Sequence, residues 1–470
     1  MFMPMLRHCC LTLAAAALLV GTGPTSVAAA GHRFEWNERA DRVSADLLDV
    51  PVKAVLEQIH IATGWEIRIE PGVNFEVSTS FQELKSARAL ERLLGTASYA
   101  VISRPDAPPR LLVFESAIDR ATERLMGVDD PMSRAIRIED EWIIFLKPGE
   151  DAEELAGRVG ARITGRIPEL NAVRLKFESA QAAQAARSLL ESDPAVAGVH
   201  ENYEINRPAE GRASALGAPK LPKLIPADGA AEGRLVVAFI DTAVQPPTGD
   251  MAKFFLPSIQ LAGEYVPPPQ PATHSTMMHE AALQAMAQRL GAGSAANVGL
   301  LNVDIYGAGG DTSLFMLAQG LIAAANAGAS IINVSGGAAV DSAFIDAIVA
   351  RIYASGKLVV AAAGNDGGST RMTPSPSDYA LSVTASDGRG GVAWYANMNE
   401  TVDVAAPGVI VSSMTGQPTI SVGTSVATAY TSGDVAAFSL QHQLPVQESG
   451  YLIQQANPAP QTGTGNPKAP

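Results

Sequence analysis

Short apolar runs alternate with Ala-rich stretches over the second half of the chain, from Gly233 onward. Runs of this kind are typical of strands buried on both faces of a sheet, and the stretches between them suit helices. This alternation predicts a doubly wound parallel sheet, so we expect one α/β domain over residues 233–456. The expected strands are 235–240, 298–303, 331–334, 358–363, 383–385 and 402–405, and the expected helices are 281–290, 312–327 and 342–355.

The pattern in residues 33–116 predicts a smaller α+β unit. Apolar side chains recur at helical spacing after Asp49, and Gly64 ends the helix. A second helix is expected over residues 87–94, and His60 on the first helix is expected to be a surface residue. The apolar face of the first helix consists of Val52, Val55, Leu56, Ile59 and Ala62, and the strands expected around the helices are 65–69, 75–81, 99–103 and 111–114.

Residues 135–206 predict a second small α+β unit. Their pattern has the order β-α-β-β-α-β, which is typical of a ferredoxin-like sandwich. The segments that flank this unit lack apolar periodicity: 116–134 and 207–232 are expected to be exposed linkers, the latter accessible to proteases, and 457–470 a disordered tail. The expected strands are 142–146, 162–167, 172–177 and 196–205, and the expected helices are 151–159 and 181–190.

The first thirty residues have the layout of a secretory signal peptide. Arg7 and His8 precede an apolar run over 9–20, and small residues at 27–30 suit a cleavage site near Ala30. We therefore expect export, to the periplasm or the extracellular space. Both cysteines, Cys9 and Cys10, fall in this segment, so a mature chain would have neither disulfides nor thiol-bound metal.

The composition of the chain argues against some classes of binding partner. The 470 residues are 47% apolar and 17% charged, which is typical of a globular protein with several domains. A net charge of −14 argues against a nucleic-acid partner, which would require a basic face. No interior apolar run is long enough to cross a bilayer, so no membrane span is expected in the mature chain.

Four polar residues stand where strands end or helices begin in the expected sheet. Asp241 and Asn365 each follow an apolar strand, His274 stands at a helix entry, and Ser425 opens an apolar, Ala-rich helix. Functional side chains collect at the carboxyl edge of such sheets, so the four residues can converge there. Each alone has an ordinary explanation, as a turn or a helix-entry residue. Their joint placement favours a catalytic site.

The motifs around these residues carry a family resemblance. "FIDTAV", "HSTMM", "AAAGNDG" and "GTSVA" resemble the aspartate, histidine, oxyanion-asparagine and serine motifs of subtilisin-like serine proteases, in the family's order. The resemblance implies a subtilisin-like parallel sheet flanked by helices and preceded by the two small units. It also implies that Ser425 is the nucleophile, His274 the general base, Asp241 its orienting carboxylate and Asn365 an oxyanion donor.

The same resemblance implies a groove for an extended peptide or protein substrate. Its walls would be formed by Ser335, Gly336 and Gly337 on one side and by Ala361, Ala362 and Ala363 on the other. Structural calcium is possible in the family, but this sequence does not assign it. The short run between Asp241 and His274 leaves little room for calcium loops.

The two small units resemble known modules as well. "WIIFLKPGEDAEELAGRVGARITGRIPELNAVRLKF" resembles the propeptide domains of subtilisin-like proteases, which implies a zymogen. "DLLDVPVKAVLEQIHIATGWEIRIEPGV" resembles the short N-terminal domains of secretins and TonB-dependent receptors, which implies an envelope protein partner for residues 33–116. The alternative for residues 135–206 is a small ferredoxin-like binding domain. The alternative for residues 33–116 is a spacer without a partner.

Three positions depart from the family motifs. Ser275 and Ala243 stand where glycines are expected, and Ala429 stands where proline is usual. A Cβ at a glycine position would displace His274 if that backbone needs a positive φ. Two functions therefore stay open, an active secreted endopeptidase and a catalytically impaired scaffold that binds peptides. His279 is expected to be non-catalytic.

Overall fold

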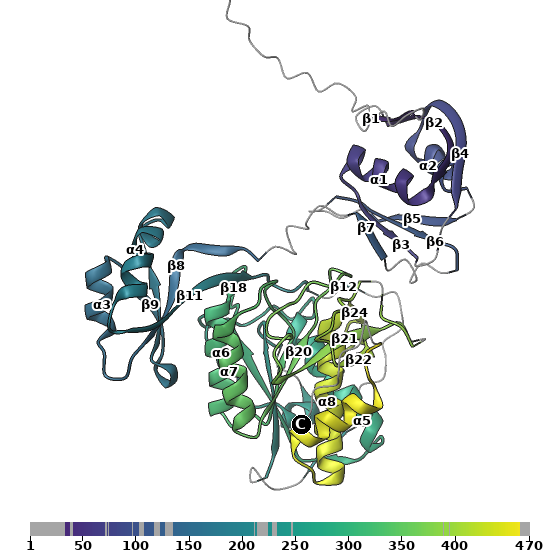
Figure 1. The fold of residues 1–470 in the computed structure, drawn as a ribbon. Coiled ribbons are helices and arrows are strands. Elements are labelled where there is room, and N and C mark those ends of the chain that lie inside the picture. Colours follow the sequence, from purple (N-terminus) through teal and green to yellow (C-terminus); the bar gives the residue numbers. More distant parts are fainter. Residues whose placement is uncertain are drawn as a thin grey trace, which may run out of the picture.

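The computed structural model describes most of the chain after residue 32. The described residues are 33–37, 41–70, 73, 75–95, 97–102, 108–116, 123–126, 135–210, 212–213, 224–227, 233–245, 248–388, 390–393 and 395–460. The expected signal peptide lies outside them. Three parts of the chain are named here by their residues: a first unit (33–126), a second unit (135–206) and a large unit (233–460), as Figure 1 shows.

The large unit is built on a seven-stranded sheet in which every neighbouring pair of strands is parallel. This confirms the predicted fold class, a subtilisin-like α/β sheet flanked by helices. In spatial order the strands are β15 (Ile259–Gln260), β17 (Val298–Asp304), β14 (Leu235–Asp241), β19 (Ile331–Val334), β20 (Leu358–Ala362), β21 (Ala380–Ser386) and β22 (Val404–Pro407).

Helices cover both faces of this sheet (Figure 1). Side chains along β14 alternate between the faces: Val237 and Phe239 join the apolar cluster under α5 and α8, whereas Ala238 and Ile240 join the cluster under α6 and α7. The helices are α5 (His274–Leu290), α6 (Leu314–Asn326), α7 (Ala343–Ala354), α8 (Thr424–His442) and α9 (Val446–Ala456), with a 3-10 helix at Gly249–Phe254. Four short strands complete the unit, and β13 (Ile225–Pro226) precedes it in the chain. The four are β16 (Ala295–Ala296), β18 (Thr312–Ser313), β23 (Val409–Ser412) and β24 (Thr419–Val422).

The second unit packs its sheet against α6 and α7 of the large unit. Phe145 contacts Phe344 edge-on, and Phe344 in turn stacks near Phe315. Arg351 donates to the carbonyl of Glu169, so polar contacts border the apolar one. The elements are β8 (Arg137–Leu146), α3 (Ala152–Val159), β9 (Arg162–Ile167), a 3-10 helix (Pro168–Leu170), β10 (Ala172–Lys176), α4 (Ala180–Ser192) and β11 (Val196–Ile205).

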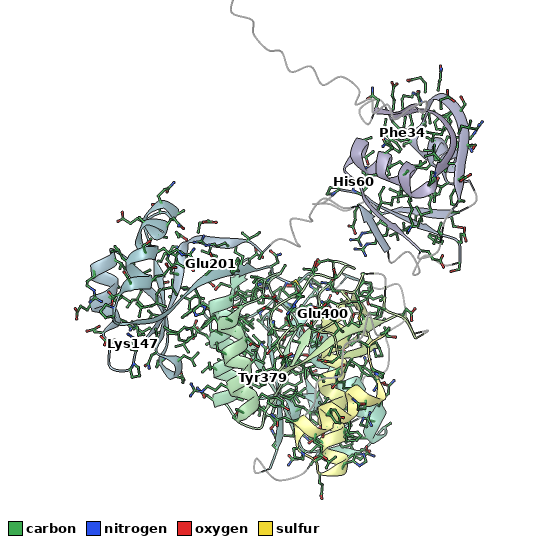
Figure 2. The ribbon with its side chains drawn as sticks, viewed as in Figure 1. Phe34, His60, Lys147, Glu201, Tyr379 and Glu400 are labelled. Carbon is green, nitrogen blue, oxygen red and sulfur yellow. The ribbon has the colours of Figure 1, made fainter. Side chains whose placement is uncertain are left out.

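The first unit has two more features than its sequence pattern indicated. A hairpin of β1 and β2 precedes the first helix, and β7 pairs antiparallel with β3 inside the segment expected to be a linker. His60 is half-buried and hydrogen-bonded to the carbonyl of Trp65 at 2.8 Å, rather than a surface residue (Figure 2). The elements are β1 (Arg33–Asn37), β2 (Arg42–Pro51), α1 (Val52–Thr63), β3 (Glu66–Ile69), β4 (Glu76–Leu84), α2 (Ser86–Leu93), β5 (Ser98–Ile102), β6 (Arg110–Phe114) and β7 (Glu123–Met126).

Two expected irregular segments are partly structured. Within 207–232, the short strand β12 (Arg212–Ala213) pairs with β24 and β13 pairs with β16, so this segment is not a simple exposed linker. In the expected tail, Pro458 bridges to Val404 and Ala459 is buried, while residues 461–470 lie outside the described residues. The part of the chain that the structure describes contains no helix long and apolar enough to cross a membrane.

The contact between the second and large units gives a prediction about stability. A Cβ at Gly165 of β9 would overlap the ring of Phe315 on α6. We expect Gly165→Val to lower the free energy of unfolding by about 1–3 kcal/mol, because the added atoms must displace an aromatic side chain in a packed contact. Urea unfolding of the full chain measures the change.

Gly157→Ala is the matched control for this substitution. It lies in α3 of the same unit, and a Cβ added there would meet no other side chain or backbone within 4 Å, so its effect should be neutral or slightly stabilising. Equal unfolding midpoints for Gly165→Val and the parent chain would contradict the observed contact.

Candidate active site

A buried aspartate–histidine pair lies at the carboxyl edge of the large sheet. Asp241 ends β14, and His274 begins α5. The Nδ1 atom of His274 is 2.9 Å from each carboxylate oxygen of Asp241, and the two residues are only 4% and 2% exposed. A carboxylate on Nδ1 fixes the imidazole tautomer and leaves Nε2 as the ring atom that can exchange a proton.

The start of α5 is held by a buried glutamine that the sequence pattern did not single out. The side-chain oxygen of Gln245 accepts from the backbone N–H of Thr273 at 3.0 Å and also from the hydroxyl of Thr276. The backbone N–H of Gln245 donates to the same Thr276 hydroxyl at 2.9 Å. Because Gln245 lies just after Asp241, these bonds tie the aspartate strand to the first turn of the histidine helix. No motif pointed to Gln245.

Ser425 lies in the first turn of α8, at the positive end of the helix dipole. Its side chain is buried, and its hydroxyl donates to the carbonyl of Ser335 at 2.9 Å. Among the described residues no hydrogen bond joins this hydroxyl to His274. The structure therefore places the serine at the same edge as the aspartate–histidine pair, with its proton directed to Ser335.

The side-chain amide of Asn365 is oriented by the residue that precedes the serine. Its oxygen accepts from the backbone N–H of Thr424 at 2.8 Å and from the Thr424 hydroxyl at 3.0 Å. The amide Nδ2 therefore points away from these donors. It would lie 3.2 Å from a Cβ at position 423, so Gly423 leaves room beside the amide N–H groups. This arrangement suits a donor to a developing oxyanion.

The expected groove residues occupy two different environments. Gly337 needs to be small, because a Cβ there would overlap the carbonyl of Thr373. A Cβ at Gly336 would lie 3.1 Å from the hydroxyl of Tyr306 and 3.7 Å from the side chain of Ile205. Ser335 accepts a hydrogen bond from the side chain of Asn333 at 2.8 Å. The alanine set is buried in or directly after β20, an interior strand of the sheet, and its members are Ala361, Ala362 and Ala363.

The chain's own segment 204–213 runs past this site. At one end Ile205 pairs antiparallel with Thr312 of β18, and at the other end Arg212 pairs antiparallel with Ile420 of β24. Because β24 leads directly into Gly423 and the serine helix, the second of these pairings lies close to Ser425 in the chain. The sequence pattern predicts the strand that ends at Ile205 but indicates only an exposed linker from residue 207 on.

Between these ends, Arg207 holds the segment through hydrogen bonds to the large unit. The guanidinium of Arg207 donates to the carbonyls of Gly307 and Gly309 at 3.1 and 3.0 Å, and its backbone N–H donates to Asp311 at 2.8 Å. Burial raises the pKa of Glu210, and the charges that act on this carboxyl include Arg207 and the His274–Asp241 pair. Glu210 is therefore within electrostatic reach of the candidate catalytic pair.

The three departures from the family motifs fit their local backbone. Ser275 and Ala429 lie inside helices α5 and α8, and none of the three departures has a positive φ. The hydroxyl of Ser275 donates to the side chain of Asn302 at 2.6 Å, and its backbone N–H donates to Thr242 at 3.2 Å. The Cβ at position 275 therefore leaves the His274–Asp241 contact in place, and the Ser275 side chain adds a hydrogen bond next to His274.

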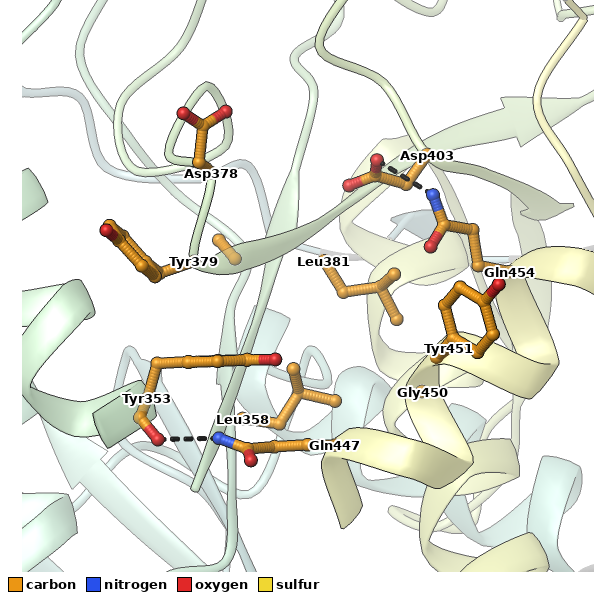
Figure 3. Close-up of a pocket in the computed structure, with 11 residues that line it drawn as sticks. Tyr353, Leu358, Asp378, Tyr379, Leu381, Asp403, Gln447, Gly450, Tyr451 and Gln454 are labelled. Atoms are coloured by element: carbon orange, nitrogen blue, oxygen red, sulfur yellow. Dashed lines mark hydrogen bonds between the residues drawn. The ribbon is translucent and has the colours of Figure 1, made fainter. Parts of the chain in front are cut away.

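Neither a metal cluster nor the pocket of Figure 3 supplies a competing site. The described ranges hold no group of three or more His, Cys, Asp or Glu side chains that could bind a metal ion. The pocket between α9 and the first residues of β20 and β21, lined in part by Tyr353, Asp403 and Gln447, is at the amino end of the strands (Figure 3). Its volume of about 40 Å³ suits a water molecule rather than a peptide.

His279 lies in the core rather than in the candidate site. Its ring is between Phe239 and Phe255, with centroid distances of 4.0 and 5.1 Å, and its Nδ1–H donates to the carbonyl of Ser275 at 2.8 Å. Burial lowers the pKa of His279 to about 4 from an ordinary value of 6.5. The side chain is thus neutral wherever the protein is folded above that pH.

The fold is that of the subtilisin-like α/β proteins, and the comparisons agree with it. Residues 233–461 match the model described as "Subtilase family", and residues 136–202 match "Fervidolysin N-terminal prodomain". Residues 233–461 of this chain are thus similar to the subtilase family, and residues 136–202 are similar to the prodomain that precedes such a domain in fervidolysin.

Two curated relatives match parts of the chain in sequence. The chain is similar to a thermophilic serine proteinase of Bacillus sp. (strain AK1), with 34% identity over 37% of this chain and 44% of the relative. It is also similar to alkaline elastase YaB of Bacillus sp. (strain YaB), with 39% identity over 31% of this chain and 39% of the relative. The matched segments thus span less than half of either relative.

The solved structure is an S393A mutant of the epidermin leader peptide processing serine protease from Staphylococcus aureus. Its TM-score is 0.52 at 17% identity, and the match covers 68% of this chain and 93% of that one. At this identity the likeness concerns the fold.

His279 gives a prediction about pH. The folded protein binds fewer protons at this ring than the unfolded chain does between pH 6.5 and pH 4, so its stability falls as the pH falls through that window. The expected loss is about 3 kcal/mol. We expect His279→Phe to remove this part of the pH dependence, as measured by urea unfolding in a Ser425→Ala background.

The exposed His442 provides the control, because His442→Gln removes a ring that no core surrounds. It should leave the pH dependence as it is in the parent chain. Parallel stability curves for His279→Phe and the parent between pH 4 and 7 would show that the buried ring is not responsible.

Proposed function

We propose that this chain is the precursor of a secreted serine endopeptidase whose Ser425, His274 and Asp241 act as a catalytic triad. The observation that carries the proposal is the buried pair of His274 Nδ1 and the Asp241 carboxylate at 2.9 Å, at the sheet edge where Ser425 begins a helix. Similarity to relatives named as a serine proteinase and an elastase supports it.

The proposed reaction is acyl transfer to serine and then to water. Ser425 Oγ attacks the peptide carbonyl carbon while Nε2 of His274 takes the hydroxyl proton. The Asn365 amide and the backbone N–H of Ser425 donate to the oxyanion that forms. The C–N bond then breaks, and His274 hands its proton to the leaving amine. Water repeats the cycle to release the acyl group, and Asp241 stabilises the imidazolium in both halves.

The precursor form would be held inactive by the second unit and by segment 204–213. This segment pairs with β18 before the site and with β24 after it, as an extended substrate would. We place the self-cleavage between Asn206 and Arg234, and the path of the segment favours a bond between positions 206 and 212. Cleavage there would detach the second unit from the catalytic one.

Ser425→Ala tests the proposal. We expect the parent chain to react covalently with a fluorophosphonate and to process itself, because both need the Ser425 oxygen. The Ser425→Ala chain should do neither and should keep its fold. Gel fluorescence, intact mass and circular dichroism measure the three properties, and peptidase activity should fall by about 10⁶.

Two controls separate activity from scaffold function. Asn365→Ala should still be labelled but should turn over peptides about 10²–10³ times more slowly, because one oxyanion donor is lost. A folded parent chain that is neither labelled nor processed, yet binds an extended peptide as well as Ser425→Ala does, would favour the catalytically impaired scaffold.

We also propose that residues 1–30 direct export to the periplasm or beyond, and that residues 33–116 bind an envelope protein. The sequence features given above support both. A pull-down from an envelope fraction, with the full Ser425→Ala chain and with the same chain lacking 33–116, tests the partner. Loss of a captured protein on deletion is the expected outcome, and identical captures would contradict it.

A further inference from the structure

In the first unit, Glu66 and Arg68 are buried on the face of the sheet opposite to α1 and α2, the two helices described there. Ile67 and Ile69 of β3 belong to the apolar core with α1 and α2. Because neighbouring side chains on a strand alternate, Glu66 and Arg68 point to the opposite face. Their exposed fractions are only 4% and 0%. A buried guanidinium is stable only where its N–H donors meet hydrogen-bond acceptors.

The acceptors come from two places. Within the unit, Arg68 Nε donates to Glu66 at 2.8 Å, and Arg110 donates to the other Glu66 oxygen at 2.7 Å. From the large unit, the backbone carbonyls of Asp366 and Gly367 accept from the two terminal nitrogens of Arg68. The planar fork of an arginine suits two adjacent carbonyl oxygens, which a lysine cannot bridge in the same way.

The two carbonyls belong to the loop that carries Asn365. On the inner side of this loop, the backbone N–H groups of Asp366 and Gly368 donate to the side chain of Asn397, at 2.7 and 3.4 Å. The carbonyls of Asp366 and Gly367 face the first unit instead. The loop is thus held from both sides, and Asn365 at its start keeps its contact with Thr424.

Charge and packing on this face agree with docking. Burial by itself would raise the pKa of Glu66, but Arg110 and Arg68 outweigh it and hold this pKa below its ordinary value. Leu112 lies opposite Arg68 in the β3–β6 register and is fully buried as well. Figures 1 and 2 show the sheet that contains β3 and β6 on the side of the first unit that faces the large unit.

We propose that the first unit docks in cis on the loop over residues 365–368 through Arg68, and that this contact restrains the loop that positions the Asn365 amide. The occupant of the buried sheet face is therefore this chain's own large unit. An outside protein that binds the same face must displace it. The first unit would then act on the catalytic groove from outside, in addition to the second unit.

Hydrogen exchange of the full Ser425→Ala chain tests the docking without any need for activity. We expect Arg68→Ala to speed amide exchange in the peptide that covers 364–370 by about tenfold, because two charge-assisted hydrogen bonds are lost. Exchange in α1 should stay slow, since Glu66 keeps its bond to Arg110. Arg88→Ala is the matched control, because Arg88 is an exposed arginine of the same unit that pairs with Glu91.

The outcomes distinguish docking from a role inside the first unit. Unchanged exchange at 364–370 with a protected α1 would overturn the proposal. If Arg68→Ala also exposes α1, Arg68→Lys decides, because it keeps a positive charge beside Glu66 but loses the fork. Faster loop exchange in Arg68→Lys supports docking, and exchange equal to that of the reference chain overturns it.

Discussion

The packing of helix α5 against helix α8 is the constraint on which the candidate site depends. One helix begins with His274 and the other carries Ser425 in its first turn. The two backbones approach closely at Gly433, where a Cβ would overlap the backbone of Ala282. Both helices belong to one apolar cluster over the sheet. The separation between imidazole and hydroxyl is therefore set by core packing, which changes little with the motion of loops.

A buried carboxylate extends this coupling to the strand before the serine. Glu280 of α5 accepts a hydrogen bond from Ser412 and from the backbone N–H groups of Ser413 and Met414, at 2.5, 3.2 and 3.0 Å. These residues form the turn between β23 and β24, the strand that pairs with β12. The histidine helix thus also holds the turn that leads into β24. Burial raises the pKa of Glu280, and the donors around it act in the opposite direction.

The local pattern of apolar residues predicts those elements that are defined by residues close together in the chain. The apolar runs predicted every long strand of the parallel sheet, because strands buried on both faces need a continuous apolar sequence. The pattern predicts this helix only over 281–290, with His274 at its entry, whereas α5 begins at His274 itself and includes Ser275 and Thr276. They are helical because Asn302 and Gln245 satisfy their hydroxyls inside the protein.

Contacts between distant segments left no periodic signal. Strand β7 was expected to be linker because only its pairing with β3 defines it. Arg212 and Ala213 were missed for the same reason, since their partners lie far along the chain in β24. The motifs nominated Asp241, His274, Asn365 and Ser425, but no pattern pointed to the Arg68 contact or to Gln245. Those residues act through partners that only the folded chain brings near.

The proposed binding of segment 204–213 at the site has a consequence for how the precursor responds to dilution. A peptide tethered at both ends inside the groove of its own chain is present at an effective concentration on the order of millimolar, whatever the protein concentration. An outside peptide must compete with that value, so a diluted precursor is as well shielded as a concentrated one. After the proposed cleavage, the part that stays joined to the second unit is held only by non-covalent contacts, so its occupancy falls with dilution. The part that stays joined to the large unit keeps its tether.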